Sequence, residues 1–299
     1  MSSAHASPPD APIAVTGATG TVGREVVRVL AETGASVRAL APRPEAVSVP
    51  GVEAARFDFE DPATYDALDG VRAVFWLRPP PVADVRRVMG PSVQYAAAHG
   101  ASGPPVGVVL SVYGANPLVP HWHLERIVRR AGPTVVLRPS FFMQNLSGTH
   151  AADIRDRSEV YVPAGGGRTS LVDARDVGEA AARVLLDAAA HLGRTYTLTG
   201  SEALTYDDVA AAISAALGRP VVYARPSARA FRERKRAEGV PEDFARTMGR
   251  IYAVARLGLA GRVTDDLEEI LGRPPRTFAA FARDVADVWE RRPVSVGGS

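Results

Sequence analysis

Short apolar runs alternate with amphipathic stretches through roughly the first 140 residues, and this alternation limits the fold more than any other feature. The runs are IAVTG (13–17), SVRALA (36–41), AVFWL (73–77), VGVVLSV (106–112) and TVVLRP (134–139). Their length and composition are typical of buried strands. Continuous apolar strands separated by helices indicate a parallel sheet that is covered on both faces. We therefore predict an α/β fold built on a doubly wound parallel sheet.

Beyond residue 140 the alternation becomes irregular. The run 195–200 predicts another strand, and 205–218 predicts a helix that begins with a capping box from Thr205 to Asp208. Asp176 is the expected N-cap of a helix near 176–186. From 227 onward the pattern is mostly helical. We expect residues 1–10 to be a disordered tail, 11–150 a dinucleotide-binding Rossmann core, and 151–299 the remaining sheet elements and a small, mostly helical substrate-binding cap packed on the core.

The composition narrows the class of protein. The 299 residues are 46% hydrophobic and 23% charged, which is ordinary for a globular protein, and no apolar run is long enough to cross a bilayer. The 35 basic residues are balanced by 33 acidic ones, which argues against nucleic-acid binding. The absence of cysteine excludes disulfides, a thiol nucleophile and cysteine-held metals. We expect a cytoplasmic monomer or homodimer, with no metal, no membrane partner and no nucleic-acid partner.

Three glycines, each three residues apart, follow the first strand and open the first helix. Gly17 would allow the tight turn, Gly20 would let a pyrophosphate approach the backbone, and Gly23 would let the helix lie close to the strand. Unpaired N–H groups at the helix start favour phosphate, and Thr19 and Thr21 add hydroxyl donors. The sequence therefore predicts a dinucleotide-binding turn.

The end of the second strand distinguishes the two nicotinamide cofactors. An acid there would bind the ribose hydroxyls of NAD, whereas an arginine would bind the 2′-phosphate of NADP. No acid stands at this strand end, but Arg38 and Arg43 lie near it, and Arg43 is the better candidate. We therefore expect NADP(H) in preference to NAD(H). Asp58 and Phe59, after the third strand, could flank the adenine, or this segment could simply cap the next helix.

Five segments resemble, in order and spacing, the NmrA-like family, an atypical branch of the short-chain dehydrogenase/reductases. They are VTGATGTVG, VVLSVYGAN, HWHLERIVRRAGPTVVLRPSFFMQNL, VDARDVGEAAARVL and VTDDLEEILGRPPRTFAAFARD. The resemblance implies a Rossmann fold with a small C-terminal substrate domain, and NADP(H) binding that includes Val22. Some members of the family reduce quinones, benzylic ethers, isoflavones or iminium compounds. Others are redox sensors that bind the dinucleotide without turnover.

The catalytic residues are harder to assign, because the Tyr-x-x-x-Lys pair of typical short-chain dehydrogenases is missing. Ser111 stands where the serine of that family would lie, and Tyr113 follows it, but residue 117 is proline. His121 and Glu125 lie one helical turn apart, and His121 takes a position that suggests a proton donor or a ribose contact. Since histidine titrates near neutral pH, it suits either task. We take His121, Tyr113 and Ser111 as the catalytic candidates.

The carboxyl ends of parallel strands form the ligand crevice of such folds. We therefore place Leu77 and Pro139, at two such ends, among the cofactor contacts. The substrate-binding candidates are mainly aromatic or apolar, although some of them could equally be core residues of the cap. They are Trp122, Phe141, Phe142, Met143 and Asn145.

Three functions fit these features. The first is an NAD(P)H-dependent reductase of a small apolar or aromatic carbonyl, quinone, imine or ene compound, which we place in secondary metabolism. The second is an NADP(H)-binding redox sensor that regulates a partner without turnover. The third is a non-redox enzyme on the same scaffold. The aromatic residues at 141–142 and Trp122 favour a small-molecule pocket, so the reductase is the leading hypothesis.

Overall fold

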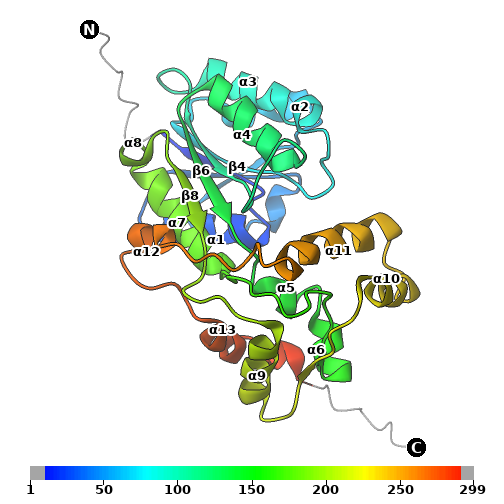
Figure 1. Ribbon diagram of the computed structural model, residues 1–299. Coiled ribbons are helices and arrows are strands. Elements are labelled where there is room, and N and C mark those ends of the chain that lie inside the picture. The colour runs from blue at the N-terminus through cyan, green and yellow to red at the C-terminus, as the bar shows by residue number, and fades with distance from the viewer. Residues whose placement is uncertain (1–10, 291–299) are drawn as a thin grey trace, which may run out of the picture. The chain divides into compact units, whose positions relative to one another are not determined.

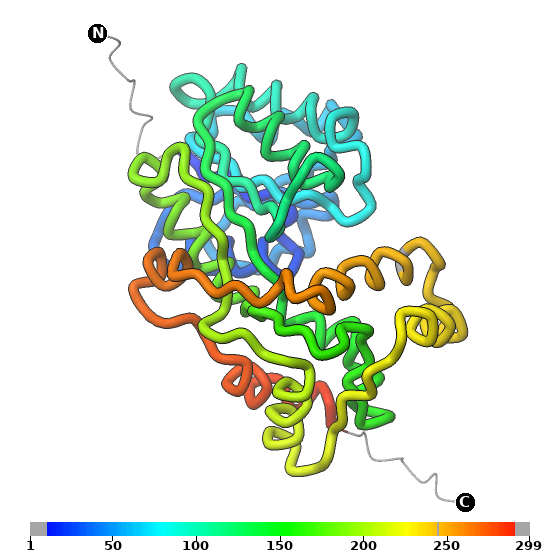
Figure 2. Tube along the Cα trace, in the orientation of Figure 1, coloured from blue at the N-terminus to red at the C-terminus, as the bar shows by residue number. Residues whose placement is uncertain are grey.

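The computed structural model describes residues 11–290, and these form two compact units (Figures 1 and 2). Unit 1 comprises residues up to Pro139 together with Ala174–Leu198 and Asp266–Pro274, and unit 2 comprises Ser140–Asp173, Thr199–Asp265 and the chain from Pro275. The tail that we expected over residues 1–10 lies outside the described residues. Both units are therefore assembled from segments that are distant in the sequence.

A seven-stranded, fully parallel sheet forms the centre of unit 1, with strand order β3-β2-β1-β4-β5-β6-β8. The strands are β1 (Ile13–Thr16), β2 (Val37–Ala41), β3 (Glu53–Arg56), β4 (Ala73–Leu77), β5 (Val106–Leu110), β6 (Thr134–Pro139) and β8 (Thr195–Leu198). This order reverses direction between β1 and β4, which is the topological switch of a doubly wound sheet. The predicted Rossmann α/β fold is confirmed.

Helices cover both faces of this sheet (Figure 1). One layer contains α1 (Thr21–Glu32), α7 (Ala174–Leu186) and α12 (Asp266–Leu271), and the other contains α2 (Val85–Val88), α3 (Gly90–His99), α4 (Pro120–Ala131) and the 3-10 helix η2 (Pro62–Leu68). Two short pieces, η1 (Pro44–Ala46) and α8 (Ala188–His191), complete the unit. In the second layer, Val93, Leu124 and Val128 pack against the sheet residues Val74 and Val109 in one buried cluster.

Helix boundaries agree with the sequence in most places. Gly34 follows α1 with φ of +75°, and Gly100 and Gly132 end α3 and α4. The prediction that Asp176 caps α7 is wrong, because the helix already begins at Ala174. Asp176 lies inside the first turn, where its carboxylate accepts from Arg273 Nη2 at 2.8 Å.

Unit 2 is mostly helical and has its own core. Its elements are α5 (Gln144–Ser147), α6 (Ala151–Arg157), α9 (Tyr206–Leu217), α10 (Ala228–Ala237), α11 (Glu242–Arg256), α13 (Phe278–Asp284), α14 (Ala286–Trp289), and a parallel pair of strands, β7 (Glu159–Val160) and β9 (Val222–Tyr223). The predicted capping box opens α9, with Thr205 and Asp208 exchanging hydrogen bonds. Large buried side chains such as Phe231, Phe278 and Trp289 fill the core.

Candidate functional site

The turn between β1 and α1 requires glycine at two positions, for different steric reasons. Gly17 has φ of +63°, in the left-handed region that favours glycine. A Cβ on Gly23 would lie 2.1 Å from the Gly17 carbonyl oxygen, so any side chain there would displace the backbone. Gly20 is exposed, and a Cβ on it would meet only the Gly17 oxygen, at 3.2 Å. The turn thus holds helix and strand together while the backbone of Gly20 stays open to a ligand.

The first turn of α1 has the properties of an anion site. Gly20 is its N-cap, no side chain caps the helix, and the first turn contains no acidic residue. The N–H groups of Thr21, Val22 and Gly23 therefore form the positive end of the helix dipole and have no side-chain capping acceptor. Arg24 Nη2 donates to the Thr19 carbonyl at 3.1 Å and adds a cation beside the turn. This arrangement suits a phosphate.

A cleft of about 310 Å³ lies beside the turn. The start of α1 forms one wall and the segment after β2 forms the other; its lining residues are Ala18, Thr19, Arg24, Val27, Ala46, Val47, Ser48 and Val49. Valine and alanine supply apolar surface, while the arginine and the two hydroxyl groups supply polar contacts. Such a mixture suits a phosphorylated nucleoside.

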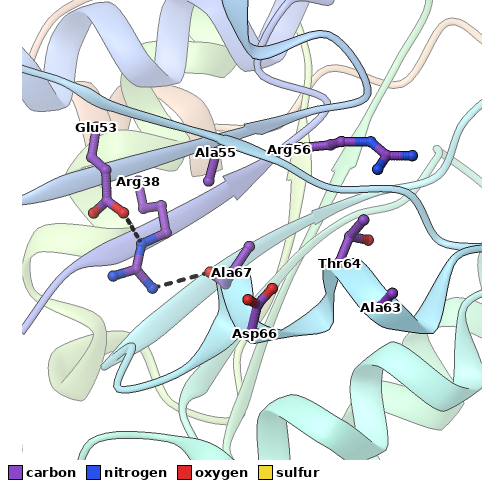
Figure 3. Close-up of a pocket in the computed structure, with 8 residues that line it drawn as sticks. All are labelled: Arg38, Glu53, Ala55, Arg56, Ala63, Thr64, Asp66 and Ala67. Carbon is purple, nitrogen blue, oxygen red and sulfur yellow. Dashed lines mark hydrogen bonds and ion pairs between the residues drawn. The ribbon is translucent and has the colours of Figure 1, made fainter.

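The two arginines near the end of β2 have different surroundings. Arg38 donates from Nε to Glu53 Oε1 at 2.8 Å and from Nη1 to the Ala67 and Asp69 carbonyls. It lines a separate hollow of about 410 Å³ over the outer strands β2 and β3 (Figure 3). Arg43 is exposed and is the N-cap of η1, whose last residue, Ala46, lines the cleft beside the glycine turn. Of the two arginines, only Arg43 directly precedes a segment that lines this cleft.

The segment after β3 turns back on itself. Asp58 Oδ1 accepts from the Glu60 N–H at 2.9 Å, and Asp61, not Asp58, is the N-cap of η2. Phe59 is buried in the core of unit 1, with its ring 4.9 Å from that of Phe57 and 6.5 Å from that of Trp76. The cap is thus one turn further on than Asp58, and Phe59 contributes to the core.

Leu77 and Pro139 end β4 and β6, as predicted. The Leu77 N–H donates to Thr16 Oγ1 at 2.9 Å, and its Cδ2 lies 3.1 Å from where a Cβ of Gly17 would be. Leu77 therefore packs directly against the glycine turn.

Ser111 lies at the carboxyl end of β5, and its hydroxyl is hydrogen-bonded to another side chain. It donates to Glu125 Oε1 at 2.5 Å, and both carboxylate oxygens of Glu125 accept from Arg138, at 2.9 and 2.7 Å. Ser111 and Glu125 are buried. This network ties the ends of β5 and β6 to the middle of α4.

His121 lies in the first turn of α4, and its Nε2 accepts from Arg78 Nε at 3.4 Å. Burial, together with the charge of Arg78, lowers the pKa of His121 to about 4. The expectation that His121 titrates near neutral pH is therefore wrong, because this pKa keeps the ring neutral well below pH 7. Its Nδ1 is buried and has no hydrogen-bond partner among the described residues.

Tyr113 and Trp122 are both half-buried in unit 1. The Tyr113 N–H donates to the Pro139 carbonyl at 2.8 Å, which fixes the tyrosine backbone beside the end of β6. Trp122 packs edge-on against His123, and the Arg126 guanidinium lies 4.8 Å from the centre of its ring.

The other substrate candidates begin unit 2 and divide into two kinds. Met143 is buried in the core of the unit, with its N–H donating to the Val172 carbonyl at 2.9 Å. Phe141 and Phe142 are half-buried, and the Phe141 ring lies 6.3 Å from that of Tyr252. Asn145 is exposed on α5. Only the side chain of Met143 is enclosed by the core.

Sequence reasoning missed two arginines at the strand ends. Arg78 directly follows β4, and Arg138 lies in β6. Their position near strand ends in an otherwise apolar setting was visible in the sequence, but the contacts of Arg78 with His121 and of Arg138 with Glu125 depend on the fold. Within residues 11–290, no three histidine, aspartate or glutamate side chains are grouped to hold a metal ion. None of the described helices combines the length and apolar character needed to cross a membrane.

Residues 9–98 and 107–269 match the sequence profile of the NmrA-like family. The chain is 36% identical over 286 residues to the NAD(P)H azoreductase of Xenophilus azovorans. This match covers 91% of this chain and 96% of that protein.

Two solved structures share the fold at 25% identity and a TM-score of 0.80. One is the triphenylmethane reductase of Citrobacter, complexed with NADP(H), which covers 92% of this chain and 99% of its own. The other is the NADPH-dependent quinone oxidoreductase of Escherichia coli, complexed with NADPH, which covers 91% of this chain and 99% of its own.

Proposed function

Because this chain belongs to the NmrA-like family, we propose that it is an NADP(H)-dependent oxidoreductase that reduces a small apolar or aromatic carbonyl, quinone, imine or ene compound. The observation that carries the proposal is the open glycine turn before an uncapped helix, in a chain with reductase relatives along nearly its whole length.

The residues of the turn fit the dinucleotide. Gly20 leaves room on the backbone, and the N–H groups of Thr21, Val22 and Gly23 can hold phosphate oxygens, with the Thr19 and Thr21 hydroxyls beside them. The neighbouring cleft would take the adenosine half. We assign the 2′-phosphate to Arg43, since Arg38 is bonded to Glu53 in a different hollow.

Residues at or after the carboxyl ends of β3, β4 and β6 complete the proposed set of cofactor contacts. Asp58 and Phe59 lie after β3, where Phe59 offers its backbone because its ring is in the core; Leu77 packs against the turn, and Pro139 ends β6. Carboxyl ends of parallel strands are where such folds bind ligands.

The reaction needs a hydride and a proton. When bound, NADPH supplies the hydride and becomes NADP⁺, while the substrate gains that hydride and one proton. We assign the proton to the Tyr113 hydroxyl, whose backbone is fixed beside β6. His121 is neutral and Ser111 is bonded to Glu125, so these two act by holding their neighbours in place.

We assign substrate contacts to Trp122 in unit 1 and to Phe141 and Phe142 in unit 2, each taken by itself, because each has a half-buried aromatic face that suits a flat apolar molecule. Asn145 is exposed and can hold a carbonyl oxygen. Met143 lies in the core of unit 2, and Phe141 packs against the same core, so we assign Met143 a supporting role.

The test combines calorimetric titration with a substrate panel. The protein should bind NADPH more tightly than NADH and should oxidise it, read at 340 nm, with at least one quinone, imine, azo compound or enone. Binding without oxidation across the panel would support a dinucleotide sensor instead. Absence of NADPH binding would overturn the proposal.

A further inference from the structure

The loop after β4 wraps around the side chain of its own first residue. Arg78 Nη1 donates to the carbonyl oxygens of Pro79, Pro80 and Val82, at 3.0, 3.0 and 2.6 Å. A turn closed by the Val82 N–H and the Pro79 carbonyl, at 3.0 Å, completes the ring. Three consecutive prolines restrict this backbone, so the guanidinium is held in a rigid cradle.

The cradle holds the cation but does not neutralise it. Within residues 11–290, no carboxylate oxygen lies within 4.0 Å of the Arg78 guanidinium, although Arg38 and Arg138 are each paired with a glutamate. Burial lowers the pKa of Arg78, which reflects the cost of removing its charge from water. A partly buried charge without a counter-ion is costly, and an incoming anion would remove that cost.

His121 contributes to the same restraint from α4. Its Nε2 accepts from Arg78 Nε at 3.4 Å, so the proton of the neutral ring lies on Nδ1. The one carboxylate on this helix, Glu125, is bonded to Ser111 and Arg138. The histidine therefore positions the guanidinium without changing its charge.

Arg78 stands next to the nucleotide turn. The residue before it, Leu77, packs against Gly17 and donates its N–H to Thr16. The cation thus lies at the carboxyl edge of the sheet, immediately beyond the contact between β4 and the glycine turn.

We propose that Arg78 binds an oxyanion of the ligand at this edge, a phosphate or a carboxylate, and that His121 is a positioning residue for it. The oxyanion can come from the dinucleotide or from the substrate. This proposal rests on the proposed function only for the premise that a ligand binds at the carboxyl edge of the sheet.

The first experiment titrates inorganic diphosphate and NADPH into the wild type, Arg78→Gln and Arg78→Lys. Arg72→Gln is a matched control, because Arg72 precedes the same strand, donates to the Ala11 carbonyl and also has a pKa lowered by burial. If the oxyanion belongs to the dinucleotide, Arg78→Gln should weaken NADPH at least 10-fold, Arg78→Lys less, and Arg72→Gln not at all.

The second arm distinguishes the source. If the oxyanion belongs to the substrate, NADPH affinity stays the same, and Arg78→Gln raises KM at least 10-fold for a carboxylate-bearing quinone but not for its neutral analogue. The inference is overturned if neither NADPH, diphosphate nor the anionic quinone distinguishes Arg78→Gln from the wild type. If the wild type binds diphosphate but not NADPH, the proposed oxidoreductase function is overturned and the proposed oxyanion site at Arg78 is supported.

The positioning role has a separate readout. His121→Gln keeps an acceptor for Arg78 Nε and should retain anion affinity, whereas His121→Phe should lose several-fold. Nitrogen NMR of the wild type should find the ring proton on Nδ1, and the pKa of His121 should rise from about 4 in Arg78→Gln. Equal affinities in both His121 variants, or a proton on Nε2, would remove His121 from this role.

Discussion

The Ser111 hydroxyl donates to Glu125 Oε1 over 2.5 Å, where β5 ends beneath the middle of α4. Glu125 is buried and is held on its other side by Arg138, so the three side chains form one polar network. The serine at this strand end is therefore part of the scaffold of the site.

Ser111→Ala leaves one oxygen of Glu125 with a single partner. We expect it to lower the free energy of unfolding by about 1–3 kcal/mol. Glu125→Ala removes the carboxylate that is paired with Arg138 and should lower the free energy of unfolding by more, about 3 kcal/mol, since the partial exposure of Arg138 limits the loss. Urea unfolding of both variants measures these losses; an unchanged free energy of unfolding in Ser111→Ala would contradict the network.

Gly23→Ala tests the steric account of the nucleotide turn. The new Cβ would lie 2.1 Å from the Gly17 oxygen, so the start of α1 must move and NADPH affinity should fall at least 10-fold. Gly249→Ala is the control, because its Cβ would meet nothing within 4 Å in the interior of α11. The control should gain about 0.5–1 kcal/mol of stability. Retained NADPH affinity in Gly23→Ala would refute the packing argument.

The sequence predicted the parts of this molecule that depend on local pattern. The strand runs, the glycine turn, and the glycines that end α1, α3 and α4 follow from periodicity and backbone conformation. The state of His121 could not be predicted, because it depends on Arg78, 43 residues away, and on burial. The partner of Ser111 could not be predicted for a similar reason, since nothing in the spacing shows that its hydroxyl meets Glu125.

Arg43→Ala should weaken NADPH by at least 10-fold and NADH much less, because only NADPH carries the 2′-phosphate. Arg38→Ala is the comparison, since Arg38 is bonded to Glu53 and to the Ala67 and Asp69 carbonyls. It should lower stability slightly and leave the preference between the two cofactors intact. Calorimetric titration of both dinucleotides decides the matter; parallel losses for NADPH and NADH in Arg43→Ala would reject the assignment.

Tyr113→Phe removes the proposed proton donor while keeping the ring and the backbone bond to Pro139. Turnover should drop about 10²-fold or more, with NADPH affinity unchanged. The comparison is Tyr95→Phe, on α3, where the ring stacks on His99 at 4.0 Å. Steady-state kinetics at saturating NADPH measures the effect. Wild-type turnover in Tyr113→Phe would exclude Tyr113 as the proton donor.

His150 makes stability depend on acid pH. It is fully buried in unit 2 and shares a 2.6 Å hydrogen bond with the Tyr252 hydroxyl. Burial, with a smaller contribution from the charge of Lys235, lowers its pKa from 6.5 to about 4. The unfolded chain therefore takes up the proton first, so the stabilisation is complete above pH 6.5 and is lost as the pH falls toward 4.

The titration of His150 alone should lower the free energy of unfolding by about 2 kcal/mol between pH 7 and pH 5. His150→Gln can keep a bond to Tyr252 but cannot take up the proton, so its stability should fall less between these pH values. The pKa of His121 is lowered in the same way, so the stability of the variant should still fall with pH, but less steeply. Urea unfolding at pH 7 and pH 5, with the exposed His99→Gln as control, measures the difference. Identical pH slopes in the wild type and His150→Gln would show that the buried ring is not the origin of the acid sensitivity.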